Sequence, residues 1–244
     1  MCGRFTLRIA SASWCQMFLP EWAEDSSSPS TQAVLDNTRP RYNIAPTQSI
    51  ACVNRVDAGQ PRQLFFARWG LLPSWADGLS IGNRMINARS ETVDSKPSFK
   101  RAFASRRCLI PADGYFEWTK TAGGKQPYLI ERPDHGVLAM AGLWEENKKL
   151  GSEDEPLVSC TILTTDANDT TGQIHNRMPV FLDFDTHDQW LDPGSRDVEA
   201  LKSLLIPAPE DWLQATPVSK RVNSAKNDDP ACIEPVAATG QLFD

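Results

Sequence analysis

The sequence predicts an α+β fold: a curved, barrel-like and mostly antiparallel β-sheet flanked by a few helices. Strand-like runs outnumber helical ones, they are short and separated by turns, and no internal repeat is evident. The expected strands lie at residues 4–9, 50–53, 64–69, 108–110, 137–143 and 157–163. No stretch resembles a linker between domains, so residues 1–244 are expected to form one domain.

Turn residues and helical spacing divide the rest of the chain. Gly123-Gly124 separates the strand-like runs 114–118 and 127–131, which predicts a β-hairpin. Residues 21–40, rich in Ser and Pro, are expected to be a mobile loop insertion. Helices are expected at residues 10–19, 98–104 and 198–205.

Charge is unevenly distributed along the chain. The net charge of −6 argues against nonspecific coating of nucleic acid, yet residues 61–110 hold nine Lys and Arg against three Asp and Glu. This basic segment is either a solvated face or a local phosphate-binding surface. No secretory signal is visible, and no apolar run approaches the roughly 20 residues of a membrane span. The protein is therefore expected in the cytoplasm, with the nucleoid in a bacterium, or in the nucleus of a eukaryote.

The six cysteines are widely dispersed and form no Cys-x-x-Cys pair. This spacing argues against a metal site and, in a chain without a signal, against a disulfide framework. Most of the thiols are therefore expected to be buried and inert, as for Cys108 and Cys160 in strand-like runs.

Cys2 differs from the other cysteines because it follows Met1 directly. One interpretation is a small apolar residue at the start of a strand. The other is a reactive terminus, since Cys is small enough for Met1 removal to be expected and Gly3 adds no side-chain bulk beside the thiol. After that removal, residue 2 carries a free amine and a thiol on adjacent carbons.

Two side chains have the chemistry of general acids and bases. In Gly-Tyr-Phe-Glu-Trp the strand period places Tyr115 and Glu117 on one face, among large aromatic residues. Such a carboxylate is either exposed on a solvated face or buried and then paired, protonated or functional. His175 lies in an extended or loop segment, as a structural histidine or presented to a cleft. His135 and His187 are expected in a turn and on an acidic surface, without a role.

Other polar and aromatic residues give weaker signals. Asn43, Asn87 and Arg89 lie in short polar clusters that either bind a phosphate or form a turn. Trp69 and Trp75 lie in the basic segment, where tryptophans either fill the core or stack on the bases of single-stranded nucleic acid.

Taken together, seven motifs along nearly the whole chain resemble the SRAP family, also called SOS-response-associated peptidases or abasic site processing proteins. They are MCGRF at residues 1–5, RYNIAP at 41–46, WGLLPSW at 69–75, INARSET at 86–92, CLIPADGYFEW at 108–118, IHNRMP at 174–179 and PVSKRVN at 217–223. Each motif alone is weak, whereas the ordered set is strong. The resemblance implies a monomer that recognises an abasic site in single-stranded DNA and joins to it covalently, with no metal or organic cofactor.

The resemblance also implies the catalytic residues. Cys2 is the nucleophile, and Asn87 positions the reacting sugar and the N-terminus. Glu117 is the acid or base, and His175 assists proton transfer at the opened sugar. The implied chemistry is lyase-like: the amine of Cys2 forms a Schiff base with the aldehyde of the abasic sugar, and the thiol closes a thiazolidine. Removal of Met1 by the protein itself is compatible with the family's older name.

The same resemblance implies the residues that contact DNA. Arg4, Asn43 and Arg89 hold DNA phosphates or the architecture of the site. Trp69 and Trp75 shape the DNA groove or stack in it. Family members can carry a second aromatic residue directly after this last tryptophan, where the present chain has alanine.

Two alternative functions stay open at this point. One is a cysteine or N-terminal-nucleophile peptidase in which Cys2 and His175 form the reactive pair and Asn87 orients them. The other is a noncovalent module for single-stranded DNA in which Cys2 is structural. A stoichiometric DNA adduct distinguishes covalent joining from both.

Overall fold

Strands dominate the part of the chain that the structure describes, which comprises residues 2–20, 39–121 and 124–237 in a computed structural model. The strands are β1 (Phe5–Leu7), β2 (Arg41–Ile44), β3 (Ser49–Asn54), β4 (Gln63–Trp69), β5 (Asn87–Arg89), β6 (Arg107–Ala112), β7 (Gly114–Thr121), β8 (Gly124–Glu131), β9 (Leu138–Asn147), β10 (Leu157–Asp166), β11 (Arg177–Pro179) and β12 (Gln214–Pro217). The α-helices are α1 (Ser11–Phe18), α3 (Lys100–Ser105), α4 (Asp169–Gly172), α5 (His187–Leu191) and α6 (Val198–Lys202). Short 3₁₀ turns are η2 (Leu79–Arg84), η3 (Ser90–Thr92), η4 (Phe184–Thr186), η5 (Glu210–Trp212), η6 (Lys220–Asn223) and η7 (Pro230–Cys232).

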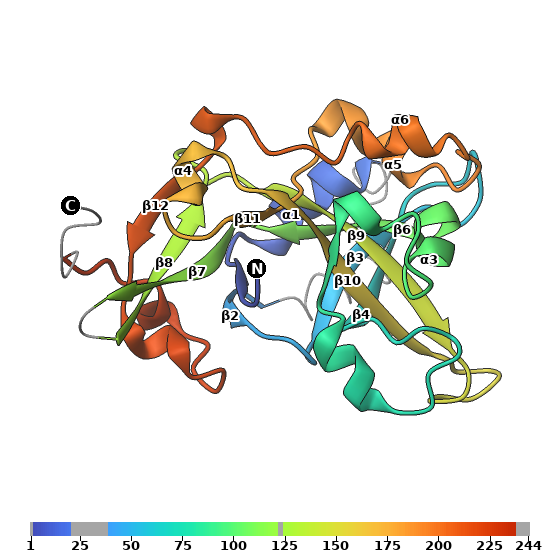
Figure 1. Cartoon of the computed structure of the whole chain (residues 1–244), viewed down its shortest axis with the longest axis horizontal. Coiled ribbons are helices and arrows are strands. Elements are labelled where there is room, and N and C mark those ends of the chain that lie inside the picture. The colour runs from blue at the N-terminus through green and yellow to red at the C-terminus, as the bar shows by residue number, and fades with distance from the viewer. Residues whose placement is uncertain (1, 21–38, 122–123, 238–244) are drawn as a thin grey trace.

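Five strands close into a barrel, on the right in Figure 1. β3 pairs with β4 and β6, β6 with β9, β9 with β10, and β10 with β4, so the ring of pairings returns to its start. Only β10 makes parallel pairings within the described residues, with β4 and β5. The predicted α+β fold with a barrel-like, mostly antiparallel sheet is therefore confirmed.

Three thiols meet in the core of the barrel. Cys52 of β3, Cys108 of β6 and Cys160 of β10 are fully buried, and the thiol of Cys52 lies within hydrogen-bonding reach of the other two. Burial raises the pKa of each thiol, which leaves them protonated at neutral pH. All six cysteines of the chain are buried and free, as the sequence predicts.

The second sheet has the order β12-β8-β7-β1-β2 and lies on the left in Figure 1. The predicted hairpin is formed by β7 and β8, with Glu117 opposite Tyr128. β1 runs antiparallel to β7, with Phe5 opposite Tyr115 and the Phe116 N–H donating to the Arg4 carbonyl at 3.0 Å. This pairing carries the N-terminal residues past the segment that holds Glu117.

β10 has different partner strands on its two edges. Its Thr164 has Arg89 of β5 as the partner on one edge and Pro179 of β11 on the other. The short strands β5 and β11 therefore lie on opposite sides of the end of β10. The polar segment that begins at Asn87 and the one that ends at Arg177 are therefore brought close together, although they are far apart in sequence.

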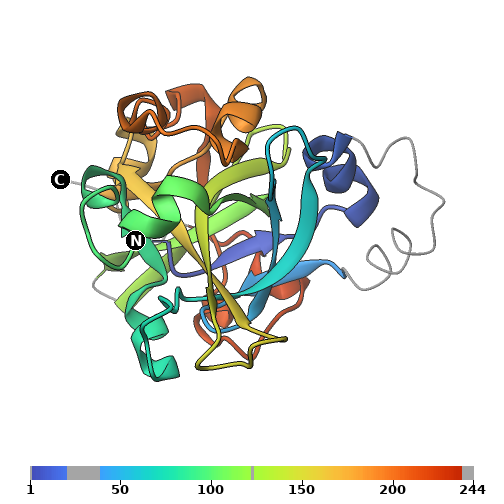
Figure 2. The ribbon, with the colours of Figure 1, turned by 90° about the vertical axis from the view of Figure 1, so that its right-hand side faces the viewer.

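Helices cover the outside of the barrel. α1 buries Trp14, Cys15 and Phe18, while α5 and α6 lie along the upper edge in Figure 1. Figure 2, turned by 90° from the view of Figure 1, shows α1 at one side of the molecule, next to the strands of the barrel. Among the described residues no helix is both long and apolar enough to cross a bilayer. The expected mobile insertion at 21–40 falls almost wholly outside the described residues.

The loop between β4 and β5 closes on itself through two glycines. Gly70 has φ +122°, and a Cβ there would lie 2.6 Å from the Gly82 carbonyl oxygen, while a Cβ on Gly82 would lie 2.8 Å from that of Gly70. Further along the loop, Asn147 Nδ2 donates to the carbonyls of Pro73 and Ala76 at 2.7 and 2.9 Å. The loop is therefore fixed both where Gly70 meets Gly82 and at residues 73–76 between them.

Candidate active site

Cys2 is fully buried and lies three residues before the start of β1. Its carbonyl accepts a hydrogen bond of 2.7 Å from Asn87 Nδ2, and its thiol lies 3.7 Å from the Arg4 carbonyl. Burial, and secondarily the charge of Glu117, raise the pKa of the Cys2 thiol far above its usual range. The thiol is therefore protonated at neutral pH, and the backbone of residue 2 is held in one position.

Glu117 and Tyr115 share the face of β7 that is directed toward Cys2. Glu117 is 4% exposed and Tyr115 is 1% exposed. Burial raises the pKa of Tyr115, and the charges of Glu117 and Cys2 raise it further. The strand period thus predicts correctly that the two side chains lie on one face, and their neighbour on the adjacent strand is the N-terminal segment.

His175 lies in the loop between α4 and β11, as the sequence predicts. The Arg177 backbone N–H donates to its Nδ1 at 3.0 Å, so the neutral ring carries its proton on Nε2. His175 and Glu117 line one open cleft of about 450 Å³. A carboxylate and an imidazole in a common cleft can exchange protons with one substrate.

Three residues that were not expected in the site complete the lining of this cleft: Trp118, Lys125 and Asn223. The Trp118 indole N–H donates to Asn223 Oδ1 at 2.7 Å, which joins the hairpin to η6. Trp118 and Asn223 lie within two of the family motifs, at residues 108–118 and 217–223, so the sequence could have indicated them as site residues. Lys125 follows the glycine turn and belongs to no motif.

Arg4, which is partly buried, and the buried Asn43 are joined in a polar network with the segment at residues 222–227. Arg4 Nη1 donates to Asn43 Oδ1 at 2.9 Å and to the Val222 carbonyl at 2.8 Å. Asn43, which is fully buried, donates from Nδ2 to the carbonyls of Ser224 and Asn227 at 3.0 and 2.7 Å. Of the two roles that the resemblance offers, phosphate contact or architecture, the position of Asn43 fits architecture.

The three remaining predicted residues differ in exposure. Trp69 is fully buried, donates from its indole to the Ile86 carbonyl at 2.9 Å and packs edge-on against Phe5 at 5.3 Å. Trp75 is 50% exposed, and Arg89 is exposed at the end of β5. Trp69 therefore supports the strand that carries Asn87 and offers no free face to a base, whereas Trp75 and Arg89 lie at the surface.

Comparisons with known proteins identify the family of the chain. The family model described as SOS response associated peptidase (SRAP) matches residues 1–225. The chain belongs to this family. Abasic site processing protein YoqW of Bacillus subtilis is 40% identical over 240 residues, which cover 96% of this chain and 99% of YoqW. Abasic site processing protein HMCES of Gallus gallus is 33% identical over 249 residues, covering 89% of this chain and 69% of HMCES.

Solved structures carry the same fold as this SRAP chain. A protein of Bacteroides thetaiotaomicron superposes with a TM-score of 0.77 at 25% identity, covering 97% of this chain and all of that one. A phage-related protein of Bordetella bronchiseptica superposes with a TM-score of 0.66 at 29% identity, covering 90% of this chain and 95% of that one. The described residues of the SRAP chain hold no group of three or more His, Cys, Asp and Glu placed to bind a metal ion.

Proposed function

We propose that this protein recognises abasic sites in single-stranded DNA and joins to them through Cys2, forming a thiazolidine after removal of Met1. The observation that carries the proposal is the placement of Cys2. Asn87 Nδ2 donates a hydrogen bond of 2.7 Å to the Cys2 carbonyl, and the charge of Glu117 raises the pKa of the Cys2 thiol. Family membership and the names of the relatives point to the same substrate. The adduct would protect the damaged site.

The reaction is a condensation of three groups. The amine of Cys2 attacks the aldehyde carbon of the ring-opened sugar, and loss of one water gives a Schiff base. The thiol adds to the same carbon, its proton passes to the nitrogen, and a five-membered ring closes. No oxidant or reductant is needed, and closure is intramolecular because both nucleophiles belong to one residue.

Glu117 and His175 are the groups assigned to proton transfer. Glu117 would protonate the sugar ring oxygen or the departing water, and His175 would return these protons in the reverse reaction. Since Nδ1 of His175 already accepts a hydrogen bond from Arg177, its neutral ring donates only from Nε2. The shared cleft supports the pairing of these two groups.

The protonation state of the thiol favours this chemistry over peptide hydrolysis. A cysteine peptidase uses a thiolate, and burial together with Glu117 raises the pKa of the Cys2 thiol far from the range in which a thiolate is abundant. A free α-amine has a pKa of about 7.7–8.0 and is partly neutral near pH 7. The amine is therefore the better first nucleophile.

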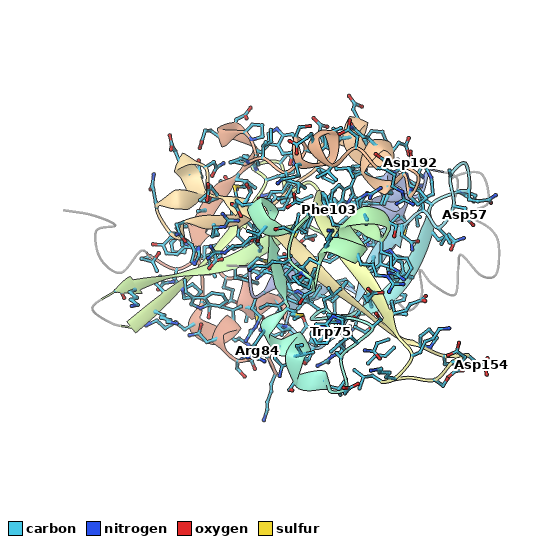
Figure 3. All side chains as sticks on the ribbon, turned by 45° about the vertical axis from the view of Figure 1, so that its right-hand side comes forward. Asp57, Trp75, Arg84, Phe103, Asp154 and Asp192 are labelled. Atoms are coloured by element: carbon cyan, nitrogen blue, oxygen red, sulfur yellow. The ribbon has the colours of Figure 1, made fainter. Side chains whose placement is uncertain are left out.

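Exposed side chains of the basic segment are candidates for contact with DNA. Trp75 and Arg84 are exposed and are labelled in the lower part of Figure 3, whereas Asp192 is labelled in its upper part. The first two belong to the basic segment 61–110, whereas residues 183–211 hold eight Asp and Glu against two Lys and Arg. The basic segment does not form one face, because its Arg62 pairs with Asp188 and its Arg107 donates to the Asp192 carbonyl. Exposed cations such as Arg84 and Arg89 are therefore the ones offered to a polyanion.

Intact mass measurement and denaturing electrophoresis test the proposal. The mass should show a chain that begins at Cys2, and an oligonucleotide with one abasic site should yield a shifted band. Cys2→Ala should abolish the band, whereas Cys15→Ala, which alters another buried thiol, should not. A band of full yield from Cys2→Ala would contradict the proposal.

A second variant separates the amine from the thiol. Cys2→Ser retains the amine, so borohydride should trap a Schiff base, but no thiazolidine can close. A correctly processed Cys2→Ser that is never trapped would exclude the amine as the first nucleophile. Retention of DNA only under native conditions would indicate a noncovalent binding module, and repeated turnover of a peptide would indicate a peptidase.

A further inference from the structure

Glu91 makes a contact that joins the two strands of the site. It lies in η3, two residues after Arg89, and its carboxylate meets the guanidinium of Arg177 in a bidentate ion pair: Nη1 with Oε1, and Nη2 with Oε2 at 3.0 Å. Planar bidentate pairs of this kind fix orientation as well as charge. The pair therefore connects the segment after β5 to the start of β11.

The ion pair spans the end of β10. β5 and β11 pair with opposite edges of that strand, so neither holds the other directly by backbone hydrogen bonds. The Arg177 side chain is 6% exposed and also donates from Nη2 to the Thr164 carbonyl at 2.7 Å, on β10 itself. Glu91, Arg177 and Thr164 thus tie the three strands at one point.

Arg177 in turn fixes the histidine of the cleft. Its backbone N–H is the donor to Nδ1 of His175, at 3.0 Å. On the opposite side, Asn87 lies four residues before Glu91 and holds the Cys2 carbonyl. The chain of contacts from Cys2 to His175 therefore passes through the ion pair between Glu91 and Arg177.

We propose that Glu91 is a positioning residue, which sets the ring of His175 against the segment that holds Cys2 by clamping Arg177 across the end of β10. The proposal rests on the function proposed above, because it assigns proton transfer to His175. Glu91 is not among the residues that line the cleft, so no contact with the reacting atoms is assigned to it. Its effect is transmitted through Arg177.

The second carboxylate on Arg177 supplies a matched control. Asp166 Oδ1 accepts from Nη1 at 2.7 Å, but its side chain is 79% exposed, it makes one contact, and it belongs to β10, not to the segment after β5. An exposed single contact contributes little. Asp166→Asn removes a similar charge without breaking the tie between β5 and β11.

The experiment compares Glu91→Gln with Asp166→Asn and wild type. At saturating abasic DNA, Glu91→Gln should slow adduct formation or reversal by about 10²-fold, the effect of misplacing a reacting group by about 1 Å, and Asp166→Asn by less than about 3-fold. Affinity for the same oligonucleotide without an abasic site should stay within about 3-fold for both variants. Unchanged rates in Glu91→Gln, or a loss confined to affinity, would overturn the proposal.

Nitrogen-15 NMR of the imidazoles in the DNA-free protein gives an independent readout. Nδ1 of His175 should report an accepted hydrogen bond in wild type and Asp166→Asn, and a mixture of tautomers in Glu91→Gln. Identical ring signals in all three proteins would overturn the proposal. If wild type forms no adduct at all, the proposed function fails, while the ring signals still decide the positioning role. Should Glu91→Gln not fold, Glu91→Asp, which keeps the charge but shortens the reach, serves for both measurements.

Discussion

Glu117, on β7 of the second sheet, and Glu145, on β9 of the barrel, are equally buried, at 4% exposed, but their surroundings differ. Glu145 forms an ion pair of 2.9 Å with Arg106, and its pKa is raised because burial outweighs that cation. Glu117 lines the open cleft beside His175 and acts electrostatically on Cys2. Burial of a carboxylate therefore does not mark a reactive site, whereas its neighbours do.

His175 and His187 differ in their surroundings as the two glutamates do. His175 is partly exposed in the cleft, with one ring nitrogen held by the backbone. His187, expected on an acidic surface, is instead buried beside the barrel, where it stacks on Phe18 at 5.6 Å. Burial, and then the charge of Arg62, lower its pKa to about 4. The polar groups around the barrel serve packing, and those of the cleft are available to a ligand.

Neutralising the two glutamates tests this comparison most strongly. Glu117→Gln should slow adduct formation by about 10²–10⁴-fold, because it removes the general acid or base, and should leave the melting temperature unchanged or higher. Glu145→Gln should leave the rate unchanged and the stability unchanged or higher, because burial disfavours the charge of Glu145 and the Gln side-chain oxygen can still accept a hydrogen bond from Arg106. Timed denaturing gels and thermal unfolding measure both effects. Slow adduct formation by Glu145→Gln would contradict the proposed difference between the two glutamates.

Two tryptophans allow a second test. Trp69→Ala should lower the stability by about 3–5 kcal/mol, because a buried aromatic side chain leaves a cavity. Trp75→Ala should leave stability unchanged and weaken binding of single-stranded DNA by about 1–3 kcal/mol, the contribution of one stacked base. Denaturant unfolding and fluorescence anisotropy measure the two quantities. Unweakened DNA binding by Trp75→Ala would remove this residue from the interface.

Acid titration sharpens the difference between the histidines. In the unfolded chain His187 titrates at about 6.5, against about 4 when folded. Between these values the unfolded state binds the extra proton, so stability is lost as the pH falls from about 6.5 to about 4, by about 3 kcal/mol in all. His187→Phe keeps a ring beside Phe18 and should flatten this slope in denaturant titrations. An unchanged slope would contradict a buried, neutral His187.

Long or strongly patterned elements were predictable from the sequence. β3, β4, β9 and β10 lie where the apolar runs predict them, and the hairpin of β7 and β8 follows from its glycine turn. The strands β2, β5, β11 and β12, by contrast, have three or four residues each, too few to show a period of two. α6 ends at Lys202, before the predicted boundary, because helix ends depend on local caps and packing.

The residues of the cleft were predictable only in part. Glu117 and His175 were found because their side chains are chemically unusual in their segments, and the structure places both in one cleft. Lys125 could not be found, because one exposed lysine after a turn resembles any other. Burial of Asn43 and Trp69 also depends on contacts with distant segments, which no local pattern encodes.

The contact between Gly70 and Gly82 has a practical consequence for protein engineering. The neck of this loop is held backbone to backbone, so it does not depend on the side chains at residues 77–80. Those four positions can therefore be replaced by other sequences without disturbing the contact between the two glycines. A Cβ atom at either glycine would instead clash with the backbone of the other and push the two segments apart. Because β5 follows this loop, the displacement would also disturb the side-chain amide of Asn87.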